Sequence, residues 1–258
     1  QPEPGEVIRL FVDLPDGTER EIRIGAEGPT QDDPEFTFAI GADALETSQN
    51  FQATLDAALA KVGRTDLKAA SAVQAAENFF DTAPRSDGTF GPQRVQPGAS
   101  GTFADATAIA GDPNNTINWY QGENGTGAAR QTSTGTVDEN LRVSYGARAN
   151  EKAYREVLQS LATFVAADFS SATPDNQEFY QALADRTKAG LTEGENGISG
   201  IRQNHIEFAA AHRVTADAKE RHKIADATID SAVADIENIN REEVALKLLR
   251  LQTVLQAS

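Results

Sequence analysis

The sequence predicts an α+β fold in which a β-rich domain with two short helices, residues 1–145, precedes a helical domain, residues 146–258. Two observations predict this order. The first 40 residues contain alternating and β-branched runs that turn residues separate, as in antiparallel strands. The last 58 residues contain neither Pro nor Gly, and apolar residues recur there at spacings of three and four, as in long helices.

The composition excludes several classes of function. The chain has 258 residues, with 23 Lys and Arg against 39 Asp and Glu, and a formal net charge of −16. Nucleic acids and anionic membranes are bound through clustered positive charge, so this balance argues against both as partners. The absence of Cys removes disulfides, thiolate catalysis and thiolate metal sites.

The ends of the sequence are also informative. The chain contains no Met, even at position 1, and residues 1–6 do not read as a signal peptide. We therefore interpret it as an internal or processed piece of a longer protein. No apolar run approaches the ~18 residues of a membrane span, which argues against membrane insertion.

The charge is unevenly placed. Residues 1–50 carry 3 basic and 12 acidic side chains, whereas residues 201–258 carry 8 and 9 with the two signs interleaved. Interleaved charge is typical of a helix whose ionic faces flank an apolar row. We therefore expect the N-terminal end to stay in water and the C-terminal end to pack against other helices.

The N-terminal residues predict a small sheet. A run over 7–14 and an alternating run over 19–24 flank the turn sequence Pro-Asp-Gly-Thr at 15–18, which predicts a β-hairpin because Pro presets φ and Gly accepts positive φ. A third short strand is expected over 36–40. These three strands are expected to form one sheet.

Two amphipathic helices follow, over about 44–62 and 66–80. Both are short and rich in Ala, and we expect them to pack against the sheet. Residues 82–116 are rich in Pro, Gly, Ser, Thr and Asn without a sustained period, which predicts loops and short strands.

Two further strands are expected over 116–120 and 141–145, with turn glycines at 122–127 between them. Neighbouring residues of a strand face opposite sides, so Trp119 is expected in the core and Tyr120 at the surface. The alternative is that this aromatic pair serves surface recognition, by stacking on carbohydrate or by contacting another subunit.

The chain after residue 145 is predicted to be almost wholly helical. Helices are expected over 149–167 and from Pro174 to about 189, followed by a glycine-punctuated stretch over 190–200. The last segment, 201–258, would extend roughly 85 Å as one helix at 1.5 Å per residue. A helix of that length needs a partner along it.

Apolar residues at coiled-coil spacing mark a candidate assembly interface on this segment. We call these seven residues the seam: Ile229, Val233, Ile236, Val244, Leu248, Leu251 and Leu255. The two halves of the seam are out of phase, because Val244 lies eight positions after Ile236. We therefore expect a break at 238–240, in the form of an unwound turn, a kink or a helix end.

No arrangement of residues points to catalysis, to a cofactor or to a metal. His205 and His212 lie seven apart on one helix face, roughly 10 Å from each other, and no carboxylate completes a compact site with them. Asp138 and Glu139 are adjacent, which does not establish the spacing that two catalytic carboxyl groups require. The glycines at 122–127 lack the strand, helix and Lys of a phosphate loop. We expect no enzyme activity, no cofactor and no metal.

The C-terminal residues resemble the flagellin superfamily, most closely its hook-associated junction members of alphaproteobacterial type. The resemblance rests on residues 242–258, EEVALKLLRLQTVLQAS, and on the preceding IENI at 236–239, where Asn238 stands in place of the more usual Asp. Residues 143–151, VSYGARANE, resemble the rod segment of these proteins. The sequence WYQG at 119–122 resembles their Trp-Tyr-Arg-Gly element, with Gln121 replacing Arg.

This resemblance implies an elongated rod of long antiparallel or coiled-coil-like helices with a β-rich domain inserted between them, from which the terminal helices are missing here. It also implies an extracellular location on the bacterial flagellum, with export through the flagellar secretion apparatus without a cleaved signal peptide. The implied partners are other flagellar axial proteins, namely hook-associated proteins and flagellin, together with further copies of the chain and an export chaperone.

Three functions remain open at this point. The first is a structural junction between hook and filament that acts by self-assembly, without catalysis. The second is flagellin itself, which copy number along the filament would distinguish from the first. The third, from a different class, is a cell-surface module that binds a glycan or a receptor through Trp119 and Tyr120.

Overall fold

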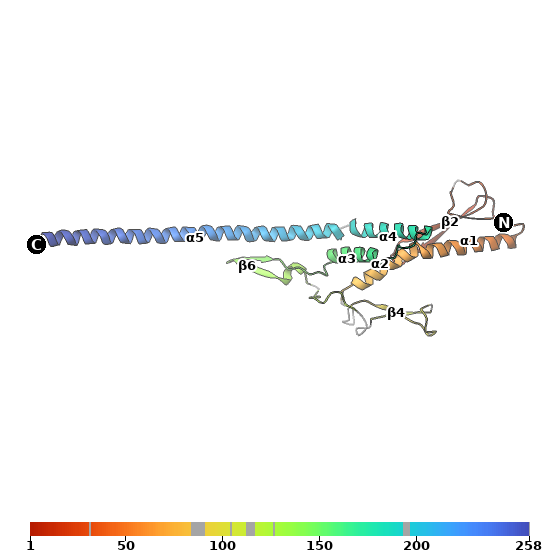
Figure 1. Ribbon diagram of the computed structural model, residues 1–258, viewed down its shortest axis with the longest axis horizontal. Helices are drawn as coiled ribbons and strands as arrows, with labels where there is room; N and C mark the ends of the chain where they lie inside the picture. The colour runs from red at the N-terminus through yellow and green to blue at the C-terminus, as the bar shows by residue number, and fades with distance from the viewer. Residues whose placement is uncertain are drawn as a thin grey trace. The chain divides into compact units, whose positions relative to one another are not determined.

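The computed structural model describes residues 1–30, 32–83, 91–103, 105–111, 117–125, 127–192 and 197–257, and only the backbone of 197–199 and 238–240. The fold is mixed α+β, with small sheets and several helices (Figure 1). The chain divides into two compact units. Unit 1 comprises Gln1–Thr126 and Arg148–Gln203, and unit 2 comprises Gly127–Ala147 and Asn204–Ser258.

A three-stranded sheet opens unit 1. Strands β1 (Val7–Asp13) and β2 (Glu19–Ala26) form the predicted hairpin, with Leu10 opposite Ile22. Gly17 lies in the turn at φ +78°, a conformation that Gly adopts without steric cost. The third predicted strand is β3 (Phe36–Phe38), which pairs with β2 in parallel. The strand order is therefore β1-β2-β3.

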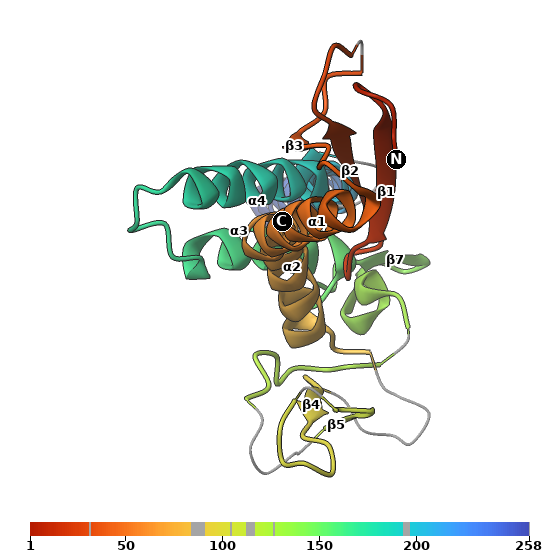
Figure 2. The ribbon, with the colours of Figure 1, turned by 90° about the vertical axis from the view of Figure 1, so that its right-hand side faces the viewer.

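Helix α1 (Ala44–Arg64) covers one face of this sheet (Figure 2). Its N-terminus is capped reciprocally: the Asp43 carboxylate accepts a hydrogen bond from the Glu46 backbone N–H, and the Glu46 carboxylate accepts one from the Ala42 N–H. Side chains from helix and sheet form one buried cluster, which consists of Ile22, Ile24, Ala26, Phe38, Ala58 and Val62.

Helix α2 (Asp66–Phe80) follows after Thr65 alone and does not pack as predicted. It lies against α3 (Lys152–Ala166) and α4 (Pro174–Thr192), and not against the sheet. A second cluster forms there around Ala69, Phe179 and Leu183. The small Ala side chains of α2 let the neighbouring helices approach closely, which explains this choice of partner.

The two compact units of the structure therefore do not correspond to the two domains, 1–145 and 146–258, that the sequence predicts. Helices α3 and α4 belong to the same unit as the N-terminal sheet, because their apolar faces complete the cluster around α2. Short strands β4 (Arg94–Gln96) and β5 (Ala108–Ala110) form a separate antiparallel pair in unit 1.

The strand predicted over 116–120 is wrong for positions 117–120, which form no strand. Thr116 lies outside the described residues. The strand predicted over 141–145 is confirmed as β7 (Leu141–Ser144), but its partner is β6 (Thr134–Asp138). A 3₁₀ turn, Ala129–Thr132, precedes this hairpin in unit 2.

Helix α5 (Gly197–Gln256) is the longest element of the chain. It begins four residues before the predicted start and runs without interruption through 238–240. The predicted kink or helix end at that position is therefore wrong: 238–240 contains neither Pro nor Gly, and the backbone hydrogen bonds of a helix continue there. Among the described residues, no helix is both long enough and apolar enough to cross a membrane.

Candidate assembly surface

The C-terminal part of α5 exposes all of its side chains. Every described residue from 219 to 257 is exposed, with the side chains of 238–240 outside the description. Local charge pairs support the helix, including Lys247 Nζ with Glu243 Oε1 at 2.9 Å, one turn apart. No described side chain of this stretch is therefore buried in an apolar cluster.

The structure places all seven residues of the seam on this exposed stretch. Val233 is the least exposed at 49% and Leu255 the most exposed at 72%. Isolated exposed apolar residues are ordinary, but a row that continues for more than seven turns of one helix is typical of an interaction surface.

The uninterrupted helix changes the geometry expected for the seam. The eight-residue step from Ile236 to Val244 turns the apolar row by about 80° around the helix axis. Val233, Val244 and Leu255 nevertheless recur at intervals of 11 residues. An 11-residue repeat favours a straight or slightly right-handed pairing of helices over a left-handed coiled coil.

Sequence reasoning missed a second group of apolar side chains on the same helix. Leu246, Leu249 and Val254 are 63–68% exposed and lie outside the seam. Their spacings of three and five residues do not match a heptad, so coiled-coil spacing does not reveal them. The last four turns of α5 are consequently apolar around much of their circumference.

The hairpin β6–β7 packs against the earlier part of α5 within unit 2. Arg130, just before β6, donates from Nε to Glu207 Oε2 at 2.7 Å and from an Nη atom to the Gly146 carbonyl at 2.7 Å. Its guanidinium carbon lies 4.2 Å from the ring centroid of Phe208. The Arg130 side chain is only 16% exposed, so this contact is well shielded from water.

A second contact ties the far end of this hairpin to α5. Asp138 accepts from an Nη atom of Arg221 at 3.1 Å and lies 3.5 Å from Nε2 of His222. The backbone N–H of Glu139, the Arg221 guanidinium and the His222 imidazole all lower the pKa of the Asp138 carboxyl by hydrogen bonding to its charged form. The seam begins beyond this contact.

Trp119 and Tyr120 lie together, and not on opposite faces. Their ring centroids are 5.7 Å apart, and the Trp119 ring is 5.2 Å from that of Phe80. Both are half-buried, so the predicted contrast between a core Trp119 and a surface Tyr120 is wrong. Because no strand forms here, the alternation of side chains does not apply.

The polar atoms of this pair bond within unit 1. Trp119 Nε1 donates to the Phe80 carbonyl at 3.1 Å, and the Tyr120 hydroxyl donates to the Glu123 carbonyl at 2.9 Å. The structure therefore assigns part of each ring to an internal aromatic cluster. Less of each ring face is therefore exposed for a sugar to stack on.

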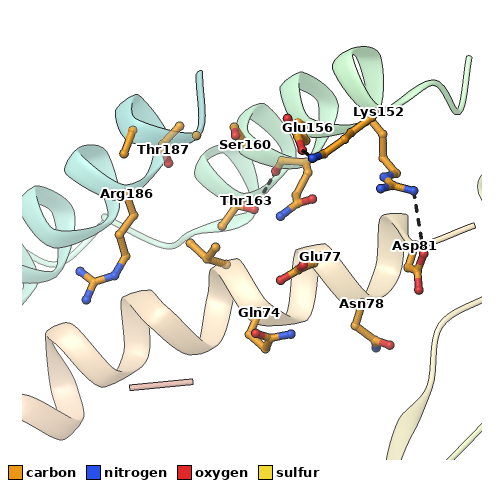
Figure 3. Close-up of a pocket in the computed structure, with 15 residues that line it drawn as sticks. Gln74, Glu77, Asn78, Asp81, Lys152, Glu156, Ser160, Thr163, Arg186 and Thr187 are labelled. Carbon is orange, nitrogen blue, oxygen red and sulfur yellow. Dashed lines mark hydrogen bonds and ion pairs between the residues drawn. The ribbon is translucent and has the colours of Figure 1, made fainter. Parts of the chain in front are cut away.

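A polar cavity of about 650 Å³ lies between α2, α3 and the end of α4 (Figure 3). Its lining carries three acidic and three basic side chains, and four of these form pairs across the cavity wall: Arg155 lies 3.9 Å from Asp81, and Lys152 lies 3.7 Å from Glu156. Sequence reasoning missed this cavity because its lining comes from three helices that are distant in sequence. Its matched charges give no preference for an anionic or a cationic ligand.

The structure does not bring the histidines into a metal site. His205, His212 and His222 follow α5, and His222 contacts Asp138. Within the described part of the chain, no group of three or more His, Cys, Asp or Glu side chains has the proximity that a metal ion requires.

Two short sequences match the acceptor pattern for N-glycosylation. The pattern at 114–116 lies outside the described residues. In the pattern at 124–126, the Asn124 amide is already bonded: it donates to the Thr82 carbonyl and accepts from Asn150 Nδ2.

Comparison with protein-family models, with curated proteins and with solved structures finds no match to this chain.

Proposed function

We propose that the chain is a structural subunit of the bacterial flagellum, at the junction between hook and filament, and that it acts by self-assembly without catalysis. The observation that carries the proposal is the seam: a row of apolar side chains, 49–72% exposed, on an uninterrupted helix. The likeness of residues 236–258 to the flagellin superfamily supports the same function.

In this proposal α5 belongs to a rod of packed helices, and the β-containing part of the chain is a domain inserted into that rod. The partners are hook-associated proteins, flagellin, further copies of the chain and an export chaperone. The protein is extracellular, and it is exported through the flagellar apparatus without a cleaved signal peptide. The interleaved charges of 201–258 guide the register of the helices.

Burial of the seam supplies the driving force for association. Full burial of one Val, Leu or Ile side chain contributes about 1.5–3 kcal/mol, so seven contribute roughly 10–20 kcal/mol before the costs of association are subtracted. The 11-residue interval in the seam favours a straight partner helix. Such a partner would bury the seam over its whole length.

A double substitution, Leu248→Asp with Leu251→Asp, tests the proposal. It places two charges in the seam, and we expect it to abolish incorporation into the flagellum and motility. The matched control is Arg250→Gln with Thr253→Asp, which makes the same change of two units in net charge, three residues apart, on the side of the helix away from Leu248 and Leu251. Circular dichroism verifies that each variant remains folded.

Normal motility of the seam variant would contradict the proposal. Counting copies by immunogold labelling then separates the two flagellar functions. Label confined to one ring at the base of the filament indicates a junction protein, whereas label along the filament indicates flagellin.

A further inference from the structure

Strand β1 is an open edge of the three-stranded sheet. It pairs with β2 on one side, and Figure 2 shows it at the margin of the sheet. The N–H of Leu14 bonds to the carbonyl of Thr18, and the N–H of Ala26 bonds to the carbonyl of Glu6. The even-numbered residues of β1 therefore direct their backbone N–H and C=O groups toward β2. The backbone groups of Val7, Arg9, Phe11 and Asp13 therefore point away from β2.

The side chains of these outward-pointing residues share the sheet face that α1 does not cover. Phe11 is 60% exposed and the Arg9 side chain is 52% exposed. Asp13 is exposed and has no ion-pair partner within the described part of the chain. An exposed edge strand without Pro or a bulge offers unpaired hydrogen-bonding groups to another strand.

Like charges face each other between β1 and β2. Arg9 lies directly opposite Arg23, and Asp13 lies directly opposite Glu19. Like charges at directly opposed positions destabilise an antiparallel pair. The charge of Arg9 is partly compensated by Glu21 at 3.7 Å and Asp32 at 3.4 Å. The charge of Asp13 is therefore less compensated than that of Arg9.

We propose that the edge of β1 pairs antiparallel with β1 of a second copy of this chain, with Phe11 opposite Phe11 on the twofold axis. This register places Arg9 opposite the Asp13 of the second copy, and Asp13 opposite its Arg9. The neighbouring registers lack this match: one sets Arg9 against Phe11, and others set Arg9 against Arg9 or Asp13 against Asp13.

The same register also continues the apolar face of the sheet. Leu10 and Val12 pack against the cluster beneath α1. In the dimer, Leu10 of each copy would lie opposite Val12 of the other copy. Two three-stranded sheets thereby join into one six-stranded sheet. The interface is small and each chain carries a net charge of −16, so the dimer is weak and requires salt to screen repulsion.

Charge reversal at the edge of β1 tests the proposal. The experiment uses the chain that carries Leu248→Asp and Leu251→Asp, because these substitutions remove association through the seam. In this background, sedimentation equilibrium up to about 1 mM protein in 0.15 M salt should detect a dimer. Arg9→Asp alone and Asp13→Arg alone should each weaken it at least about tenfold, because both charge pairs become repulsive.

An equal mixture of the two charge-reversal variants should recover association, because each heterodimer again sets Arg opposite Asp. The matched control is Asp56→Arg, which makes the charge change of Asp13→Arg at an exposed position of α1, away from the strand edge, and should leave the edge dimer intact. A monomeric background chain, or a mixture that associates no better than its components, would overturn the proposal.

Cross-linking supplies a readout that does not depend on Arg9. The chain has no Cys, so Phe11→Cys introduces a single thiol. Opposed Cα atoms in a hydrogen-bonded pair are about 5.5 Å apart, within the range that a disulfide spans. Mild oxidation should give a covalent dimer from Phe11→Cys but not from Glu19→Cys, and equal yields would contradict the register. The proposal holds independently of any flagellar function.

Discussion

Arg186 of α4 donates from Nε to the carboxylate of Asp16 at 2.7 Å, across 170 positions of sequence. Asp16 lies in the β1–β2 turn and its side chain is 7% exposed, while that of Arg186 is 15% exposed. The same guanidinium lies 3.5 Å from Asp66 at the start of α2. One arginine therefore connects the hairpin, α2 and α4 within unit 1.

Removal of this arginine should destabilise unit 1. Arg186→Ala leaves the buried Asp16 carboxylate without its ion-pair partner, which we expect to cost about 2 kcal/mol in the free energy of unfolding. Urea titration followed by the fluorescence of Trp119, the single Trp of the chain, measures this change.

Arg64→Ala is the matched control for that experiment. Arg64 lies 2.6 Å from Asp175, a shorter distance, but the two side chains are 59% and 36% exposed. Exposed ion pairs contribute about 0–1 kcal/mol, so this variant should stay near the wild type. An equal loss from both variants would mean that burial does not determine the strength of these contacts.

Stability of unit 1 should fall in acid partly through Asp16. Burial raises the pKa of this carboxyl, but hydrogen bonds from Thr18 and Arg186 outweigh burial and hold the pKa below its ordinary value. A pKa that is lower in the folded than in the unfolded chain stabilises the fold above about pH 4, and this contribution is lost as the pH falls through the folded value.

Asp16→Asn should therefore lower the urea concentration at the midpoint of unfolding at pH 7. The difference in this midpoint between variant and wild type should shrink as the pH falls from about 4 to 2. Trp119 fluorescence in urea at each pH measures it. A difference that is constant over this interval would contradict an ionised role for Asp16.

The hairpin β6–β7 should loosen from α5 when Arg130 is removed. Arg130→Ala deletes its contacts with Glu207, Gly146 and Phe208, and we expect hydrogen exchange over 134–144 to accelerate about tenfold or more. Arg142→Ala is the control, because the Arg142 side chain bonds to Thr134 at the exposed surface of the hairpin. No change in exchange for Arg130→Ala would mean that the hairpin is held by other contacts.

Helix α5 should exchange unevenly in the free chain. Residues 204–218 include half-buried side chains and the buried Ala218, whereas the described side chains from 219 onward are all exposed. A helix without packing is marginal in water, so amides over 223–256 should exchange at least about tenfold faster than those over 204–218. Uniform protection along α5 would contradict the view that the seam lacks a partner in the free chain.

Most of the elements could be predicted from the sequence because their signals are local. The Pro-Asp-Gly turn and its flanking alternation define β1 and β2, and the apolar periods define α1 to α4 within a few residues. The seam is predictable for the same reason, since spacing along one helix determines which residues share a face. The strand over 116–120 failed because a β-branched run needs a partner strand, and the partner of β7 is β6.

The continuity of α5 and the packing of α2 required the tertiary structure. A phase shift in an apolar row does not unwind a helix whose backbone hydrogen bonds are intact, so the break inferred at 238–240 did not follow. Spacing along the chain likewise did not reveal that Trp119 and Tyr120 share one aromatic cluster, or that Arg130 holds a hairpin against α5.

By itself, then, the sequence determined where strands and helices form and which face of α5 is apolar, because propensity, turns and periodicity act over a few residues. Only the tertiary structure decided that Asp16 pairs with Arg186, that α2 packs on α3 and α4, and that β1 is left as an open edge. Those outcomes depend on which distant surfaces bury each other, and a one-dimensional pattern does not contain that information.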